Sequence, residues 1–313
     1  LICPSRQSKE TTTVQPYRSV LFVPAHKTSW FAKAIDAGPD AVCFDLEDSV
    51  PEHLKAGARE QVAEAVAAYS QSHPALGLFV RPNSLGTRLT GLDLEAAVVP
   101  GLTGVFAPKV DSALDVVRYD ALLDHFEARA GVTGLEYIIP VETIHGIQNC
   151  EEIAAASERV GAMIGPTAEH ADIAKAVGFE WTPEGLESMV HRTKILLATR
   201  AVDRHPLTAL WERINDLDGL RDFSIRSRRM GFRGQIVLHP SHVPVVNAVY
   251  TPDAEQIAFY RGLLETYEAA AARGDGAVMY GEVHVDKAHA DKATEWLARV
   301  DTLASLNGGL PSA

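Results

Sequence analysis

The sequence predicts an α/β protein, a (β/α)8 TIM barrel with a C-terminal helical extension. Short apolar runs alternate with helical patterns from residue 19 onward, and they give eight strand–helix units before residue 253. That number of units over that length is typical of a closed barrel. Several of the runs end in an ionisable residue. No GxGxxG motif follows any of them, which disfavours a doubly wound open sheet, the competing architecture.

Each apolar run is interpreted as one strand, and the helical patterns lie between the runs. The predicted strands span residues 19–25, 41–47, 76–82, 104–110, 135–142, 160–166, 206–214 and 234–240. Helical patterns are clear at 29–38, 55–70 and 112–130. In a parallel barrel the carboxyl ends of all strands meet at one mouth, so the ionisable residues that end these runs are expected to share a site.

Three segments are expected along the chain. Residues 1–17 are polar and without periodicity, which predicts a flexible N-terminal arm. The barrel is expected over residues 18–252. Residues 253–313 form a C-terminal extension with a helix, a short strand pair and a last helix. Closing a barrel does not need this extension, so we expect it to pack outside the barrel, cover the mouth or reach a neighbouring subunit.

Composition excludes some classes of partner. The formal net charge is −12, which argues against a nucleic-acid surface. No stretch approaches the roughly 18 apolar residues of a membrane span. The three cysteines show no CxxC spacing, and an odd number without a secretory signal indicates a reducing cytoplasm. The sequence therefore predicts a cytoplasmic protein that contacts neither nucleic acid nor membrane.

Carboxylates gather at the expected mouth. Asp45 and Glu47 share one face of a strand because side chains alternate with period two, and Asp48 begins the loop. Glu142 ends another apolar run. Acids this close need a divalent cation, an arginine or a raised pKa to offset their repulsion. Oxygen ligands without a His or Cys cluster favour Mg²⁺.

Two cations follow neighbouring strands. Arg81 ends the third run, where its planar fork suits a carboxylate or an enolate oxygen, or simply pairs with the nearby acids. Lys109 holds the same position on the next run, and an ion pair with the acids is favoured there over direct catalysis. Among the histidines, His239 is expected to line the mouth and His191 to lie on a solvated helix face. His170 lies next to Glu169 after the sixth run and is assigned no role.

The ordered motifs resemble those of the citrate lyase β-subunit-like proteins, within the HpcH/HpaI aldolase/citrate lyase family that includes malyl-CoA and citramalyl-CoA lyases. The resemblance extends from Arg18 to the C-terminal helix. The motifs that carry it are RSVLFVPA, FAKAIDAGPDAVCFDLEDSVPEHLKAGARE, FVRPNSLGT, GVFAPKVDSA, IIPVETIHGIQN and GFRGQIVLHPSHVPVVNAVYTP.

The resemblance implies a barrel that assembles as a homotrimer and uses Mg²⁺ beside a CoA or acyl-carrier thioester. By position, Glu142 corresponds to the first metal ligand and Glu47 to the acid that supports a metal-bound water. Arg81 corresponds to the arginine that holds the enolate or keto-acid oxygen. Asp286, in the segment GEVHVDKAHADKA, corresponds to a catalytic acid/base that enters from the adjacent subunit.

Two segments depart from the family pattern. After the sixth run, IGPTAEHADIAKAVG carries extra residues, so the second metal ligand is Asp172 when aligned from the helix and Glu169 in the alternative; Asp172 is preferred. The first loop reads PAHKTSWFAKA where relatives commonly have a Gly-Asp-Arg-Pro turn, which puts the usual CoA or substrate contacts of that loop in question.

The function that follows from the resemblance is a carbon–carbon lyase for a 3-hydroxy-3-carboxyacyl-CoA of the malyl or citramalyl type. It is expected to yield acetyl-CoA and a keto acid through a thioester enolate, with synthase or thioesterase activity also known in the family. Arg81, Glu142 and Lys109 are expected to bind the substrate. The alternatives are the β subunit of a multi-subunit citrate lyase that acts on a citryl-acyl carrier, and a non-catalytic CoA-ester-binding relative.

Overall fold

Eight parallel strands form a closed barrel, which confirms the predicted fold class. The structure, a computed structural model, describes residues 16–306, so nearly all of the predicted N-terminal arm lies outside the described residues. Each strand pairs with the next in chain order, and β8 closes the ring on β1. The strands are β1 Ser19–Pro24, β2 Ala41–Asp45, β3 Gly77–Arg81, β4 Gly104–Phe106, β5 Glu136–Pro140, β6 Val160–Gly165, β7 His205–Thr208 and β8 Gly234–Val237.

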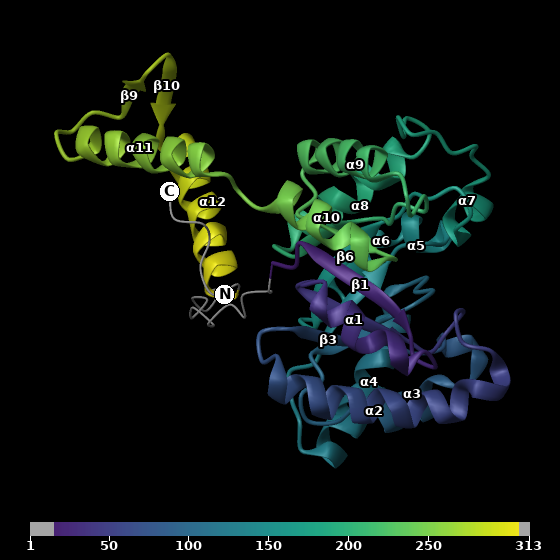
Figure 1. Cartoon of the computed structure of the whole chain (residues 1–313). Helices are drawn as coiled ribbons and strands as arrows, with labels where there is room; N and C mark the ends of the chain where they lie inside the picture. Colours follow the sequence, from purple (N-terminus) through teal and green to yellow (C-terminus); the bar gives the residue numbers. More distant parts are fainter. Residues whose placement is uncertain (1–15, 307–313) are drawn as a thin grey trace, which may run out of the picture.

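Helices follow the strands and surround the ring (Figure 1). They are α1 Phe31–Asp36, α2 Lys55–Ser72, α3 Thr90–Ala97, α4 Ala113–Ala130, α5 Ile144–Gln148, α6 Cys150–Ala155, α7 Asp172–Val177, α8 Met189–Ala201, α9 Leu217–Met230 and α10 Val243–Tyr250. None of the helices within residues 16–306 is long and apolar enough to cross a bilayer.

Alternation along the strands decides which side chains reach the mouth. On β2, Ala41 and Cys43 lie in the cluster that fills the barrel interior, whereas Val42 and Phe44 pack against the helices. The same parity places the next inward position of β2 at Asp45. On β3, Phe79 faces the interior, so Arg81 does too. The register pairs Asp45 directly with Arg81, which brings a carboxylate and a guanidinium together at the barrel mouth.

The opposite end of the barrel is closed by Tyr17. Its ring meets Phe79 edge-on, and its hydroxyl donates to Glu136 at 2.9 Å. The backbone carbonyl of Tyr17 accepts a hydrogen bond from His205 Nε2 at 2.9 Å. A Cβ at Gly77 would lie 2.8 Å from the Tyr17 ring, so only glycine leaves room for this closure. The barrel is therefore closed at the end where its strands begin, and the mouth lies at the other end.

The C-terminal extension has a small core of its own. It comprises α11 Ala254–Ala271, the antiparallel strands β9 Ala277–Tyr280 and β10 Val283–Asp286, and α12 Lys287–Leu306. Leu263, Val285 and Ala293 form this core. Figure 1 shows the extension beside the barrel, with the β9–β10 hairpin at its far end.

The extension is attached to the barrel by ion pairs. Glu295 of α12 contacts Arg200, at the end of α8, at 2.9 Å, and it also pairs with Arg233, immediately before β8. Both arginines lie at the N-terminal end of the strands, away from the mouth. The attachment therefore leaves the mouth uncovered by α12 of the same chain.

Two predicted strands are clearly too long, and the run at 104–110 is one of them because β4 ends at Phe106. The run at 206–214 was expected to be strand throughout, but β7 ends at Thr208. Ala209 and Leu210 line a cavity at the mouth, and Trp211 packs against Trp181 and Phe223. The apolar pattern continues past the strand because these residues cover the core from a loop.

Candidate active site

Arg81 is held rigidly by Asp45 at the barrel mouth. Arg81 Nε and Nη2 donate to the two oxygens of Asp45, each at 2.7 Å. Burial alone would raise the pKa of Asp45, but the hydrogen bonds and charge of Arg81 outweigh it and lower the pKa. The remaining nitrogen, Nη1, lies 3.4 Å from Glu47. The guanidinium also lies over the Phe22 ring, 5.1 Å from its centroid. Arg81 therefore pairs with the acids, and these contacts also fix the orientation of its guanidinium.

Glu47 is a buried carboxylate whose described neighbours contact it through ion pairs. Only 3% of the residue is exposed, and neither oxygen has a partner with hydrogen-bond geometry among residues 16–306. Its contacts are ion pairs with Arg81 at 3.4 Å and Lys109 at 3.1 Å. Burial raises the pKa of Glu47 against the opposing charges of these two cations. A buried carboxylate in this condition is suited to bind an ion, a water or a substrate hydroxyl.

Glu142 lies on the other side of the same mouth, two residues beyond β5. Its Oε1 accepts the backbone N–H of Lys109 at 3.0 Å. Burial raises its pKa to about 7, and the negative charges of Glu47 and Asp172 add to this effect, while Arg81 opposes it. Burial therefore dominates the electrostatics of this carboxyl, and the nearby charge of Arg81 does not offset it.

Lys109 connects the acids of the mouth. Its Nζ lies 3.1 Å from Glu47, 3.3 Å from Asp48 and 3.8 Å from Asp172. Burial would lower its pKa, but Glu47 and Asp48 outweigh this effect and raise the pKa to about 12. The ion pair expected from the sequence is present, and it involves three acids.

The two alternatives for the second metal ligand lie in different surroundings. Asp172 begins α7 and faces Lys109, close enough to Glu142 to raise its pKa. Glu169 lies on the preceding loop, and its carboxylate is 3.6 Å from Arg213. Asp172 is therefore the one of the two that shares the mouth with Glu142.

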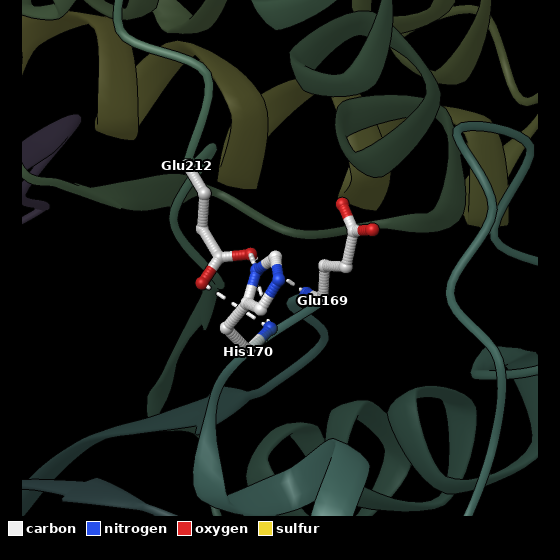
Figure 2. Close-up of side chains that lie close together, drawn as sticks. All are labelled: Glu169, His170 and Glu212. Atoms are coloured by element: carbon white, nitrogen blue, oxygen red, sulfur yellow. Dashed lines mark hydrogen bonds and ion pairs between the residues drawn. The ribbon is translucent and has the colours of Figure 1, made fainter.

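Figure 2 shows how the loop that carries Glu169 is held. The carboxylate of Glu212 accepts the backbone N–H of Glu169 at 2.8 Å and that of His170 at 3.2 Å. Ligand atoms of Glu169, His170 and Glu212 lie within 4.8 Å of one another, largely exposed at the rim. Glu212 is already used by the backbone, so this trio fixes the loop that precedes Asp172. The sequence alone does not identify Glu212.

Two cavities meet at Arg81. The larger, about 430 Å³, is lined by Trp30, Lys33 and His239 together with Asp45. His239 accepts the N–H of Ser241 through Nδ1, so the proton of the neutral ring lies on Nε2. The expectation that His239 lines the mouth is therefore met.

The smaller cavity measures about 170 Å³ and is lined by Glu142 and Arg81, with Thr167 and Ala168 from the loop after β6. Phe22 borders both cavities. Thr167, like Trp30 and Lys33, was missed by sequence reasoning. Trp30 and Lys33 lie in or just after the first loop, and Thr167 lies in the loop after β6. Both loops depart from the family pattern, and this departure could have pointed to these residues.

One predicted orientation is wrong. His191 was expected on a solvated face of its helix, but it is 6% exposed. Its Nε2 donates to the carbonyl of Pro166 at 2.9 Å, and its ring stacks on Phe179. The face of α8 that bears it packs on the end of β6, where tertiary contacts outweigh the local polar pattern.

Asp286 does not join the mouth of its own barrel. It ends β10 on the hairpin that Figure 1 shows apart from the barrel. Its carboxylate contacts His289 Nδ1 at 2.7 Å, and this hydrogen bond lowers the pKa of Asp286. The expected role in a neighbouring subunit stays a prediction.

A closed parallel barrel with acids and a fixed arginine at its carboxyl-end mouth defines a (β/α)8-barrel protein equipped for chemistry on small, oxygen-rich ligands. Within that class, the model of the HpcH/HpaI aldolase/citrate lyase family matches residues 18–240. The chain belongs to this family, which confirms the resemblance seen in the motifs.

Several named relatives resemble the chain over nearly its whole length. A (3S)-malyl-CoA thioesterase of Cereibacter sphaeroides is 30% identical over 93% of this chain and 96% of its own. An L-malyl-CoA/beta-methylmalyl-CoA lyase of Cereibacter sphaeroides is 32% identical, over 89% of this chain and 93% of its own. The crystal structure of CitE from Mycobacterium tuberculosis, in complex with magnesium, acetoacetate and coenzyme A, has a TM-score of 0.70 and 31% identity, covering 91% of this chain and 98% of that one.

Proposed function

We propose that this protein is a Mg²⁺-dependent carbon–carbon lyase. Its substrate would be a 3-hydroxy-3-carboxyacyl-CoA of the malyl or citramalyl type, and its products acetyl-CoA and a keto acid. The observation that carries the proposal is the mouth itself. There, buried Glu47 has no partner with hydrogen-bond geometry in the described part of the chain, and it lies beside a fixed Arg81 and the desolvated carboxyl of Glu142. The relatives named for malyl-CoA chemistry support the substrate class.

The donor set fits Mg²⁺. Glu142 and Asp172 would hold the ion with water and substrate oxygens completing its shell, since hard cations prefer oxygen ligands. The desolvated state of Glu142 supports this role, because an adjacent divalent charge would restore its ionised form. When bound, Mg²⁺ supplies Lewis-acid polarisation of the keto-acid oxygens. The magnesium-bound structure of the CitE relative supports the assignment.

Two side chains would assist cleavage, one by accepting a proton and one by stabilising the negative charge that develops. The carbon–carbon bond of the substrate breaks as its hydroxyl proton leaves, giving a keto acid and a thioester enolate. Glu47, whose raised pKa suits a proton acceptor, would take the hydroxyl proton. Arg81, fixed by Asp45, would donate to the developing enolate oxygen, a contribution of about 3 kcal/mol for a preorganised donor.

A proton must then reach the enolate carbon. Asp286 of a neighbouring subunit would deliver it, so the working unit would be a homo-oligomer, with a trimer as the expected form. The position of Asp286 on a projecting hairpin supports transfer between subunits. The larger cavity, with Trp30 and Lys33, would take the CoA arm, and the smaller one, beside Glu142, the keto acid.

Two related functions use the same geometry. Hydrolysis of the thioester is supported by the thioesterase relative, and there a water would attack the thioester carbonyl. The β subunit of a citrate lyase, acting on a citryl-acyl carrier, is supported by the family description. A non-catalytic CoA-ester-binding relative is the third alternative, and the longer loop before Asp172 is the feature that favours it.

Product analysis separates these functions. Purified protein would be given malyl-CoA and citramalyl-CoA with Mg²⁺, with release of acetyl-CoA, keto acid and free CoA followed separately. Equal amounts of acetyl-CoA and keto acid support the lyase, whereas free CoA with an intact hydroxy acid supports the thioesterase. Glu142→Ala should abolish metal-dependent turnover while the fold is retained. Absence of turnover and of Mg²⁺-dependent binding of pyruvate, oxaloacetate or glyoxylate would favour the non-catalytic alternative.

A further inference from the structure

Lys109 lies among four carboxylates at the barrel mouth. Its Nζ is within 4 Å of Glu47, Asp48 and Asp172, and its backbone N–H donates to Glu142. One residue therefore contacts both proposed metal ligands, Glu142 through the main chain and Asp172 through the side chain.

The backbone of Lys109 is held in an unusual conformation. Its φ is +52°, in the left-handed region that residues other than glycine rarely adopt. Such strain persists only where the surroundings fix it, and it is common at functional sites. Here the strained turn points the amide at Glu142 and sends the side chain toward Glu47 and Asp172.

Lys55, a second lysine near the mouth, has an ammonium that is fixed by hydrogen bonds and can be compared with that of Lys109. Lys55 is 8% exposed, and its Nζ donates to the carbonyls of Leu46 and Glu47 and to Asn83, all at 2.7–2.8 Å. The Lys109 side chain is 35% exposed and its contacts with carboxylates range from 3.1 to 3.8 Å. Lys55 is thus built into the fold, whereas the contacts of Lys109, including its hydrogen bond to Asp48 at 3.3 Å, are longer and partly exposed.

We propose that Lys109 is the internal counter-cation of the carboxylate site and sets its affinity for Mg²⁺. This inference rests on the proposed function, because it takes Glu142 and Asp172 as the metal ligands. In the metal-free protein the ammonium offsets the repulsion between Glu47 and Asp172. A divalent ion at Glu142 and Asp172 repels the ammonium, which swings toward Asp48.

Asp48 is suited to receive the displaced ammonium. It already lies 3.3 Å from Lys109 Nζ, and its side chain is 61% exposed, so water can solvate the pair. The movement needs a rotation of the lysine side chain only. The backbone amide of Lys109 keeps its hydrogen bond to Glu142 throughout, so Lys109 continues to orient Glu142 after its ammonium has moved.

The first test is a Mg²⁺ titration by calorimetry of the wild type, Lys109→Met, Lys33→Met and Glu142→Gln. Lys109→Met should bind Mg²⁺ roughly tenfold more tightly, because a competing positive charge is lost. Lys33 lines the larger cavity and has no ion pair to the site's acids within the described residues. It is the matched control, and Lys33→Met should change the Mg²⁺ affinity less than about twofold.

The outcomes distinguish the two claims. Unchanged or weaker binding in Lys109→Met, with binding lost in Glu142→Gln, overturns the role of Lys109 and leaves the metal site intact. Wild-type affinity in Glu142→Gln overturns the metal site itself. Thermal unfolding checks that Lys109→Met folds, and its midpoint should fall without Mg²⁺ and rise more steeply with added Mg²⁺ than that of the wild type.

The second test follows the ammonium directly. Acetic anhydride labels accessible amines, and mass spectrometry reports each lysine separately. Saturating Mg²⁺ should raise labelling of Lys109 and leave Lys55, the fixed lysine, unchanged. The rise should disappear in Glu142→Gln. Equal or lower labelling of Lys109 in the presence of Mg²⁺ would show that the ammonium is not displaced.

Discussion

Asp45 and Arg81 stand opposite each other on adjacent strands and are joined by two hydrogen bonds of 2.7 Å. The pair occupies the last inward positions of β2 and β3, so its geometry is fixed by the barrel register. Arg81 lines both the 430 Å³ cavity and the 170 Å³ cavity, so its guanidinium lies between them. The proposed catalysis depends on a guanidinium that does not need to be reoriented when substrate arrives.

Removal of the Asp45 charge should therefore weaken both fold and function. Asp45→Asn is expected to lower the free energy of unfolding by about 3 kcal/mol, because Arg81 is left without its main partner. The exposed Asp48→Asn is the matched control and should change it by less than about 0.5 kcal/mol. Urea unfolding at pH 7 measures both, and equal losses in the two variants would contradict the buried-pair account.

Glu142 should make the metal-free protein less stable as pH rises. Its pKa is about 7 in the folded chain against an ordinary value of 4.5, so the folded state holds this proton more tightly than the unfolded state. The associated stability is complete below about pH 4.5 and is lost as the pH passes through 7. Glu142→Gln should then exceed the wild type by about 2 kcal/mol at pH 8 and match it near pH 4.

The control for this prediction is a second buried acid. Glu136, at the closed end of the barrel, also has a pKa of about 7, raised by burial despite its hydrogen bond from Tyr17. Calorimetry should show wild-type Mg²⁺ affinity for Glu136→Gln, whereas its stability should change with pH in the same direction as that of Glu142→Gln. Urea unfolding without metal, from pH 4 to pH 8, provides the comparison. No stability difference between Glu142→Gln and wild type at pH 8 would show that the Glu142 carboxyl is not desolvated.

Mixed oligomers test whether the hairpin acts between subunits. Asp286→Asn and Arg81→Met should each be inactive alone. If a barrel uses the Asp286 of its neighbour, random mixing of equal amounts restores about a quarter of the wild-type sites. Cleavage of malyl-CoA after unfolding and joint refolding measures the recovery. Activity that stays at the level of the separate variants would place Asp286 and Arg81 of one chain in the same site.

Trp30 provides a test of the larger cavity. It is 53% exposed, lines that cavity and lies against Lys27, whose Nζ is 5.9 Å from its ring centroid. Trp30→Ala should raise KM for the CoA ester roughly tenfold, because a large stacking surface is removed, while kcat changes less. Leu217→Ala, another exposed apolar residue outside the cavity, is the control. A change confined to kcat would assign the cavity a different role.

The ends of β2, β3 and β5 could be predicted from the sequence to within about two residues, because apolar runs and parity are local properties. Glu47, Arg81 and Glu142 were expected at the mouth for that reason, and the structure brings them there with Lys109. The sequence left two roles open for Arg81, an ion pair with the nearby acids or binding of a substrate oxygen. The ion pair with Asp45 depends on the register of β2 and β3, which the sequence does not reveal.

Other features depend on contacts between distant segments. His191 looked solvated because its helix neighbours are polar, yet the end of β6 covers it. The left-handed backbone of Lys109 has no sequence signal, since such a conformation usually requires glycine. Glu212 holds the loop before Asp172 from 43 residues away in the chain, a pairing that no local pattern predicts.

The most direct test of the account is a crystal structure of the protein grown with Mg²⁺ and a keto acid such as pyruvate or oxaloacetate. The account predicts one ion within about 2.1 Å of carboxylate oxygens from Glu142 and Asp172, with the keto acid completing its shell beside Arg81. An ion bound elsewhere, for example by Glu169, His170 and Glu212 at the rim, with Glu142 left unliganded, would contradict it.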